Sequence, residues 1–230
     1  MTVAARRGRS PEGRAEVRRD LVAAAVELFR VRGYEDTTVD DIAAAAGVGR
    51  RTFFRYFRSK EDAISPDHEA ALARIAEVFE TAHPTEPTAT LVLRAGETVF
   101  DIYADDPRLS VERYRLTHEV PVLRDRESAS VDHYRRLFTR YLRRRFASDP
   151  DGDLRAAVIG AAVVAAHNLA LRAWLGAGAP ENGMEACRER FRRVAGMLPG
   201  EPAGGDGLHA VTQRLEQAVV RLERNTPPAP

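Results

Sequence analysis

Residues 37–60 read TTVDDIAAAAGVGRRTFFRYFRSK, and this stretch decides the fold. It opens with a helix-start signal, because Thr38 followed three residues later by Asp41 resembles a capping box. Apolar side chains then recur at helical spacing and give the predicted helix an inner face: Val39, Ile42, Ala43 and Ala46. Gly47 ends this short helix, since the sharp turn that follows needs a positive φ angle, which is costly for a residue with a Cβ.

A second short helix is predicted over residues 50–56, after a tight connection at Val48 and Gly49. Phe53 and Phe57, four residues apart, are its inward anchors. Two short helices joined by a three-residue turn that contains glycine form the helix-turn-helix arrangement. A generic helical hairpin is the alternative, but it does not explain the cationic and aromatic outer side of the second helix, which carries Arg50, Arg51, Thr52, Arg55 and Tyr56.

The segment before this stretch divides into an arm and a helix. Residues 1–13 hold Arg6, Arg7 and Arg9 without apolar periodicity, and we expect them to form a flexible basic arm. Residues 14–32 have apolar positions at the spacing of one buried helical face, which predicts a single long helix. Gly33 suits the left-handed position that ends such a helix.

The rest of the chain is a run of amphipathic helices without a convincing strand, which predicts an all-α fold. One helix that starts at Ser59 or Ser65 is expected to extend to about Ala82, with Pro66 as an early kink or a first-turn residue. Further helices are expected at about residues 88–104, 107–117, 121–147, 154–175, 183–198 and 208–224. The predicted parts are the arm (1–13), a helix-turn-helix domain (14–60), a larger helical domain (61–225) and a disordered tail (226–230).

Composition limits the class of protein. The 230 residues are 44% hydrophobic and 30% charged, which fits a soluble globular chain with a sizeable core. The longest wholly apolar stretch, residues 156–166, is far shorter than the roughly 20 residues of a membrane span. No apolar segment follows the basic N-terminus, so we expect neither a membrane span nor a signal peptide. Cys187 is the only cysteine, which excludes an intramolecular disulfide and favours a reducing cytoplasm.

Charge is distributed unevenly along the chain. Residues 1–60 hold 13 Arg/Lys and 8 Asp/Glu, a balance of +5, and the remainder holds 22 and 26, a balance of −4. A basic N-terminal quarter suggests where a polyanion binds, although ordinary scatter of surface charge is the alternative. Lys60 is the only lysine among the 35 cationic side chains, as expected of a GC-rich bacterial coding sequence.

The sequence lacks enzyme signatures. His68-Glu69 and His118-Glu119 are not followed by the second histidine of a zinc-protease helix, and no Walker, G-x-G-x-x-G or G-x-S-x-G motif occurs. The six histidines are scattered without short-range partners. We therefore expect no enzyme activity, no metal site and no cofactor.

The segment from Arg18 to Ile64 resembles the DNA-binding domain of TetR-family regulators, densely and without gaps. The residues that carry the resemblance are Ala25, Leu28, Phe29, Gly33, Tyr34, Thr37, Thr38, Val39, Ile42, Ala43, Ala46, Gly47, Val48, Thr52, Phe53, Phe54, Arg55, Tyr56, Phe57, Ser59, Lys60 and Glu61. The resemblance implies a homodimer that places its recognition helices in the major groove of a palindromic operator. It also implies a small-molecule effector that binds the C-terminal domain and releases the DNA, as in a repressor.

The expected DNA contacts lie on the recognition helix and beside it. Arginine can donate two parallel hydrogen bonds to guanine, and a threonine methyl can meet the methyl group of thymine. The predicted base-reading residues are Arg50, Arg51, Thr52 and Arg55, and the predicted phosphate contacts are Thr38, Tyr56 and Lys60. Solvent exposure without base contact is the alternative for each arginine.

Two positions on this surface depart from the family pattern. Phe54 stands where tyrosine is frequent, so a phosphate-contacting hydroxyl is missing from this candidate DNA contact. Gly49 stands where serine or threonine often caps the recognition helix, so backbone or water must satisfy the helix start.

Candidates for the effector pocket are aromatic and polar side chains of the larger domain: Phe100, Tyr103, Tyr114, His118, Tyr134, Phe138, Tyr141, His167, Asn168 and Trp174. Most aromatic residues at helical spacing are simply core, which is the alternative for each. This lining predicts a largely apolar or aromatic effector with few polar handles.

Residues 154–175 are rich in alanine and include Gly160, Val163 and Val164. Because small residues let helices approach closely, we expect this helix and the 183–198 helix to form the seam of an isologous dimer. The pocket is then expected between these helices and those of residues 88–147. Ordinary intrachain core is the alternative for the alanine-rich helix.

Two further alternatives remain at the level of sequence. An arginine run (Arg135, Arg136, Arg140, Arg143, Arg144 and Arg145) could form a second nucleic-acid surface, but a solvated face opposite Leu137, Phe138 and Leu142 is the favoured interpretation. A DNA-binding protein without an effector, acting architecturally, is the alternative function. The size of the larger domain argues against it, because a dimer seam alone needs far fewer residues.

Overall fold

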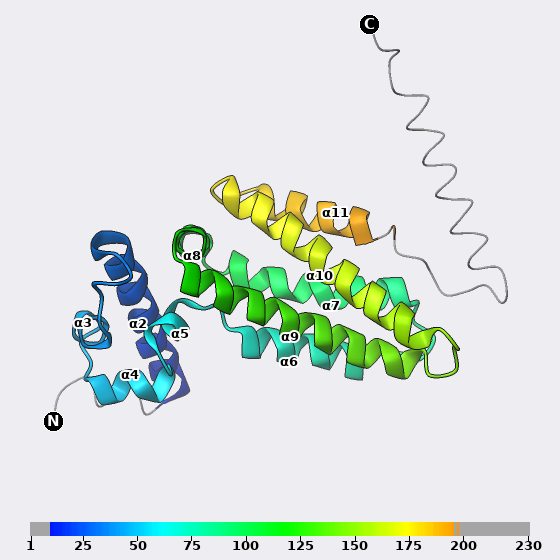
Figure 1. The fold of residues 1–230 in the computed structure, drawn as a ribbon, viewed down its shortest axis with the longest axis horizontal. Helices are drawn as coiled ribbons and strands as arrows, with labels where there is room; N and C mark the ends of the chain where they lie inside the picture. Colours follow the sequence, from blue (N-terminus) through cyan, green and yellow to red (C-terminus); the bar gives the residue numbers. More distant parts are fainter. Residues whose placement is uncertain (1–9, 196, 198–230) are drawn as a thin grey trace, which may run out of the picture.

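The computed structural model describes residues 10–195 and 197, which form ten helices and, over that range, no strand. Figure 1 shows two units side by side. The N-terminal unit consists of α2 (Pro11–Arg32), α3 (Val39–Ala45), α4 (Arg50–Tyr56) and α5 (Lys60–Ile64). The C-terminal bundle consists of α6 (His68–Glu80), α7 (Thr88–Ala104), α8 (Pro107–Glu119), α9 (Pro121–Arg145), α10 (Gly152–Gly176) and α11 (Gly183–Ala195).

The first helix of the N-terminal unit starts earlier than the sequence predicts. The Ser10 hydroxyl accepts a hydrogen bond from the backbone N–H of Gly13, so α2 begins at Pro11 rather than at Arg14. Residues 10–13 therefore do not belong to an arm, and residues 1–9 lie outside the described residues. At the other end Gly33 has a φ of 89° and a ψ of 159°, a positive-φ conformation that only glycine adopts readily.

The predicted helix-turn-helix is confirmed in its local geometry. Thr38 and Asp41 form the capping box at the start of α3, with hydrogen bonds of 2.9 and 3.2 Å in the two directions. Gly47 has a φ of 66°, as the turn between α3 and α4 requires. The α4 helix has the predicted bounds, and Gly49 at its start offers no side-chain cap.

The single helix expected from Ser59 or Ser65 to Ala82 is two helices. Ser59 caps α5, which ends at Ile64, and Asp67 caps α6 through a hydrogen bond of 3.0 Å from the backbone N–H of Ala70. Ala63 and Ile64 are buried in the core of the N-terminal unit. This unit therefore extends through Ile64, four residues beyond the expected boundary at 60.

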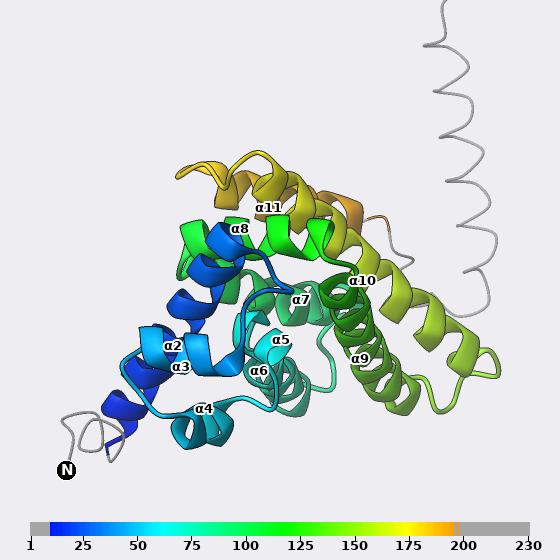
Figure 2. The ribbon, with the colours of Figure 1, turned by 60° about the vertical axis from the view of Figure 1, so that its left-hand side comes forward.

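The bundle helices agree with the expected ranges to within a few residues, and α7 agrees at both ends. The bundle core gathers apolar side chains from α6 to α11, and α10 packs lengthwise along α9 (Figure 2). On α9 the arginine-rich face is exposed while Leu137, Phe138 and Leu142 are buried, which confirms the favoured interpretation of that run as a solvated face. The helix expected at 208–224 and the tail lie outside the described residues.

The two units share apolar core at the junction of α8 and α9. Leu116 and Leu123 come from the bundle helices but are buried in the cluster of the N-terminal unit, together with residues of α2, α3, α4 and α5. The helices α2 and α8 lie in contact with each other (Figure 2). The N-terminal unit therefore packs directly against the bundle and shares part of its core with it.

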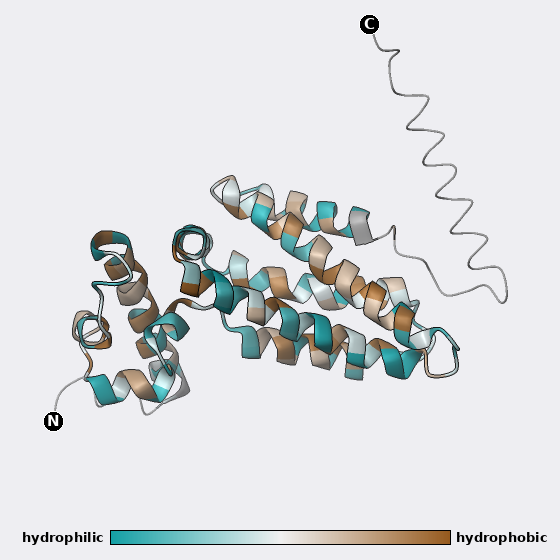
Figure 3. Ribbon diagram, in the orientation of Figure 1, coloured by the Kyte–Doolittle hydropathy of each residue, from teal (hydrophilic) through white to brown (hydrophobic). Residues whose placement is uncertain are grey.

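The helix α10 carries both buried and exposed apolar residues, and brown and tan prevail along much of it in Figure 3. Val163 on the expected seam helix is fully buried inside the protomer at 0% exposure, so this side chain does not lie at a dimer seam. A different face is uncovered: Leu154, Val158 and Leu169 are exposed, the last at 58%. Among the described residues α10 is also the one helix long and apolar enough to cross a membrane, but half of its most apolar window is buried inside the fold, so this is weak evidence of a span.

Candidate functional site

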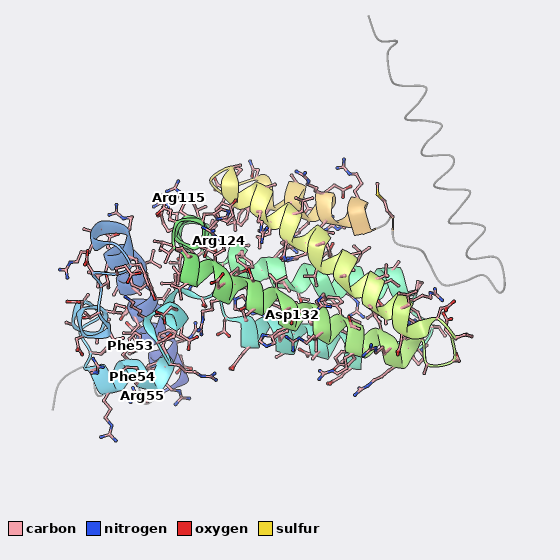
Figure 4. All side chains as sticks on the ribbon, viewed as in Figure 1. Phe53, Phe54, Arg55, Arg115, Arg124 and Asp132 are labelled. Atoms are coloured by element: carbon pink, nitrogen blue, oxygen red, sulfur yellow. The ribbon has the colours of Figure 1, made fainter. Side chains whose placement is uncertain are left out.

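The outer face of α4 is exposed and cationic. Phe53 points into the core of the N-terminal unit at 0% exposure and holds the helix in place, whereas Phe54 beside it is 46% exposed. Arg50, Arg51 and Arg55 are exposed on the same outer side. Figure 4 labels Phe53, Phe54 and Arg55 on α4, at the edge of the molecule. No other described element covers this face.

Neighbouring side chains hold Arg50 and Arg55 near the α4 surface. The Arg50 guanidinium donates a hydrogen bond of 2.7 Å to Asp40 on α3 and lies 5.2 Å from the centre of the Phe54 ring. The Arg55 guanidinium lies 5.1 Å from the ring of Tyr56 and donates a hydrogen bond of 3.4 Å to its hydroxyl. Phe54 therefore lacks the hydroxyl of the family pattern but provides a ring on which an arginine can stack.

Thr38 and Lys60 have structural partners of their own. The Thr38 hydroxyl belongs to the capping box of α3, although it remains near the surface. The Lys60 ammonium donates hydrogen bonds to the backbone carbonyls of Tyr34 (2.6 Å) and Thr37 (3.0 Å), and lies 3.9 Å from the Tyr34 ring centre. Two of its three N–H donors are thus used inside the fold, and its contact with phosphate remains a prediction. Thr52 and Tyr56 are half-buried on α4.

A cavity of about 180 Å³ opens between the N-terminal unit and the bundle. Its lining comes from the α5–α6 link and from α7, α8, α9 and α10. A second, smaller cavity of about 20 Å³ lies deeper in the bundle. Tyr103, Glu127 and Asn168 line both cavities, which therefore adjoin each other. We call them the outer pocket and the inner chamber.

The structure brings most of the predicted pocket residues together. Tyr103, Tyr114, His118 and Asn168 line the outer pocket, and Tyr134, Phe138 and His167 join Tyr103 and Asn168 around the inner chamber. Phe100, Tyr141 and Trp174 line neither cavity. Phe100 stacks on the His167 ring at 4.1 Å, Tyr141 stacks on Phe79 at 4.8 Å, and the Trp174 N–H donates to the carbonyl of Pro180 at 3.3 Å.

Polar groups cluster where the two cavities meet. The Tyr134 hydroxyl lies 2.9 Å from Nδ1 of His68, whose Nε2 lies 3.5 Å from the Glu127 carboxylate. Burial and the negative charge of Glu127 raise the pKa of both Tyr103 and Tyr134, so both phenols are neutral at physiological pH. Burial lowers the pKa of His167 to about 4, which keeps its ring neutral as well.

Sequence reasoning missed the cationic part of the lining. Arg113, Arg124, Arg126 and Arg172 all border the outer pocket. Arg113 lies three residues after the buried Ser110 and four before Thr117, on the inward face of α8, but the sequence does not mark this face because both neighbours are polar. The lining is therefore less apolar than the sequence predicts. No cluster of metal-ligating side chains occurs among the described residues.

Comparisons with known proteins match both units. Residues 21–63 match the family described as "Bacterial regulatory proteins, tetR family", and residues 86–199 match the "MftR C-terminal domain". The transcriptional regulator TcmR of Streptomyces glaucescens is 31% identical over 168 residues, which are 68% of this chain and 72% of TcmR.

Solved structures share the fold at low sequence identity. FadR of Bacillus subtilis in complex with stearoyl-CoA has a TM-score of 0.53 at 19% identity, covering 77% of this chain and 97% of FadR. The SmeT–triclosan complex has a TM-score of 0.53 at 18% identity, covering 82% of this chain and 93% of SmeT. An all-α architecture with an N-terminal helix-turn-helix unit and a larger helical bundle is common to all of them.

Proposed function

Because this chain belongs to the TetR family of bacterial DNA-binding transcriptional regulators, we propose that it represses transcription from a palindromic operator and is released by a small molecule. In this proposal a homodimer inserts two copies of α4 into the major groove. The outer pocket and inner chamber hold the effector, and the junction between the two units carries the signal.

The single observation that carries the DNA-binding proposal is the outer face of α4. It presents Arg50, Arg51 and Arg55 on a helix whose other face is fixed by Phe53. An exposed helix of seven residues with guanidinium groups on one side suits the width of the major groove. The partial immobilisation of Arg50 and Arg55 by ring contacts lowers the entropy lost when they bind a base.

The dimer proposal is supported by the uncovered face of α10. Leu154, Val158 and Leu169 lie four and eleven residues apart, which places them on one side of the helix. An exposed apolar strip of this length favours pairing with a second copy of itself. A dimer is also what a short recognition helix needs, because four or five base pairs do not define a unique genomic address.

The effector proposal is supported by the two adjoining cavities. Solved relatives of the same fold carry stearoyl-CoA in FadR and triclosan in SmeT. In this chain the outer pocket touches α5 of the N-terminal unit through Ile64 as well as four bundle helices. A ligand there contacts both units and can shift their relative position, which changes the spacing of two recognition helices in a dimer.

The experiment that tests the function is footprinting of the purified protein on fragmented genomic DNA. We expect a small number of short palindromic sites. An Arg51→Ala/Arg55→Ala variant should lose them, while Arg135→Ala/Arg136→Ala on the solvated face of α9 should keep them as a matched control. Broad coverage without a common palindrome would contradict the proposal and support the architectural alternative.

A further inference from the structure

The outer pocket carries an excess of positive charge. Four arginines border it, against the single carboxylate of Glu127. Two of the four have partners elsewhere, because Arg126 pairs with Asp62 of α5 and Arg124 donates to the carbonyl of His118. Glu127 faces His68. The balance of the pocket is therefore cationic and is not neutralised within its own lining.

Of the other two lining arginines, Arg172 is exposed to solvent and Arg113 is half-buried. Its Nε atom is buried and has no hydrogen-bond partner, and no described carboxylate lies within ion-pair distance of its guanidinium. The carboxylates of Asp106 and Asp67 act on it only from longer range. Burial, and then the nearby Arg18, lower the pKa of Arg113 to about 10, so the side chain stays charged at neutral pH in an environment that disfavours the charge.

A buried cation without a partner is costly in a folded protein. Such a group is stabilised when an anion enters the site and accepts its hydrogen bonds, and the planar guanidinium suits a carboxylate that binds through both oxygens. The cavity beside Arg113 has room for such a group, at about 180 Å³. The unpaired Nε–H and the uncompensated charge of Arg113 therefore point to an anionic occupant.

The inner chamber offers an apolar surface to a ligand whose anionic group binds Arg113. Ile75, Val131, Phe138 and Val163 make most of its wall apolar. It meets the outer pocket at Tyr103 and Asn168. A molecule with one anionic end and one apolar end can place its head group and most of its chain in the outer pocket, so that only the tip of the chain enters the inner chamber of about 20 Å³.

We propose that the effector of this regulator is an amphipathic carboxylate, whose head group binds Arg113 and whose apolar tail runs through the outer pocket and ends at the inner chamber. This inference rests on the proposed function, since it assumes that the pocket holds the effector. It replaces the largely apolar or aromatic ligand that the sequence alone predicts. A neutral apolar compound leaves the charge of Arg113 unpaired and is the competing occupant.

Three probes with the same eight-carbon chain test the head group: sodium octanoate, 1-octanol and octylammonium chloride. Binding to the full chain is measured by isothermal titration calorimetry. We expect octanoate to bind more tightly than octanol and octylammonium not to bind. Arg113→Met should weaken the binding of octanoate by about 10- to 100-fold, as loss of a charge-assisted hydrogen bond predicts. It should leave the affinity for octanol unchanged.

Arg115→Met is the matched control, because Arg115 lies two residues after Arg113 on α8, is exposed and pairs with Glu112. This variant should bind octanoate like the original protein. A thermal-unfolding measurement shows that Arg113→Met folds, and we expect its Tm without ligand to be equal or higher, since an unpaired buried charge is removed. A lower Tm together with unchanged octanoate affinity would overturn the proposal.

Equal binding of octanol and octanoate, or binding of none of the three probes, would also overturn it. Operator footprinting of the same variants separates this proposal from the proposed function. If Arg113→Met keeps the operator footprint and loses octanoate binding, the proposed function and the assignment of the effector are both supported. If the footprint is present and octanoate does not bind the original protein, only the assignment of the effector fails.

Discussion

Arg126 on α9 forms an ion pair with Asp62 on α5, so a residue that borders the outer pocket also contacts the N-terminal unit. Asp62 in turn accepts a hydrogen bond of 3.0 Å from the backbone N–H of Arg58, two residues after the end of α4. The pair therefore joins the pocket wall to the segment that follows the recognition helix. If an anion binds in the pocket, we expect it to compete with Asp62 for Arg126.

Breaking this pair should weaken the response to the effector. We expect Asp62→Asn, Arg126→Gln and the double variant to reduce, by similar factors, the change in operator affinity that octanoate causes, because all three remove one interaction. Operator Kd with and without octanoate, measured by fluorescence anisotropy, gives the response. Arg136→Gln is the control, since its partner Asp132 lies on the same helix (Figure 4). Additive effects of the two single changes would show that the residues act independently.

Arg55→Ala should weaken specific DNA binding by roughly 1–3 kcal/mol if the side chain reads a base through two hydrogen bonds. It should also relax the base preference at one position of each half-site. Affinity for the operator and for random DNA is measured at one salt concentration. An equal loss on both DNAs would make Arg55 a phosphate contact instead.

Operator affinity should fall steeply with salt, with a log–log slope near −0.9 for each phosphate neutralised. Removal of residues 1–9, which precede α2, should flatten the slope by about 0.9 for each arginine of that segment that contacts a phosphate. Arg135→Gln/Arg136→Gln should leave the slope unchanged, because these side chains pair with Asp132 on a solvated face. A slope that changes with the α9 variant would support a second nucleic-acid surface there.

Leu169→Asp should convert the dimer to a monomer and lower operator affinity by about 10²-fold or more, because a charge then lies in an apolar seam. Light scattering after size-exclusion chromatography gives the mass, and the side chain is exposed enough at 58% that the protomer should still fold. Val122→Asp, an exposed position on α9, is the control. A Leu169→Asp protein that remains dimeric would place the seam on another surface.

Acid should destabilise the fold through His167. The ring stacks on Phe100 from α7, faces Phe191 from α11 and contacts Asn168 on its own helix. Arg188, which lies over the Phe100 ring, is paired with Asp101. Its pKa is about 4 in the folded protein against 6.5 as the ordinary value. The unfolded chain therefore binds this proton first as the pH falls, and up to about 3 kcal/mol of stability is lost between pH 6.5 and 4.

Urea unfolding at pH 7, 5.5 and 4.5 measures this loss. His167→Gln should be less stable at pH 7 but should show a smaller decline with acid, because its side chain does not titrate. A decline of the same size in both proteins would assign the acid sensitivity to other groups.

The helix-turn-helix could be predicted from sequence because its determinants are local. Thr38, Asp41 and Gly47 specify a cap and a turn within ten residues, and Phe53 and Phe57 fix which side of α4 is buried. The break between α5 and α6 could not be predicted with the same rules. Pro66 suits the first turn of one continuous helix as well as a link between two, and packing of Ala63 and Ile64 on the N-terminal unit decides between them.

The site was harder to predict where it depends on how distant helices meet. Val163 lies on a helix with small apolar residues on several sides, so periodicity does not say which side faces the protomer core and which remains uncovered. Phe100 and Trp174 are aromatic residues of the kind that often line pockets. In the structure α11 packs on Phe100 and the turn at Pro180 packs on Trp174. Arg113 becomes recognisable as a pocket residue only when α8 is placed beside α7, α9 and α10.

Leu116 and Leu123 limit how freely the parts of this regulator can be exchanged. Both leucines belong to bundle helices yet fill the core of the N-terminal unit. A chimera that joins a different DNA-binding unit to this bundle must therefore provide a pocket for these two side chains, because otherwise both leucines are exposed or clash at the new junction. We expect that the operator specificity of this regulator is better changed by substituting residues on the outer face of α4 than by exchanging the whole N-terminal unit.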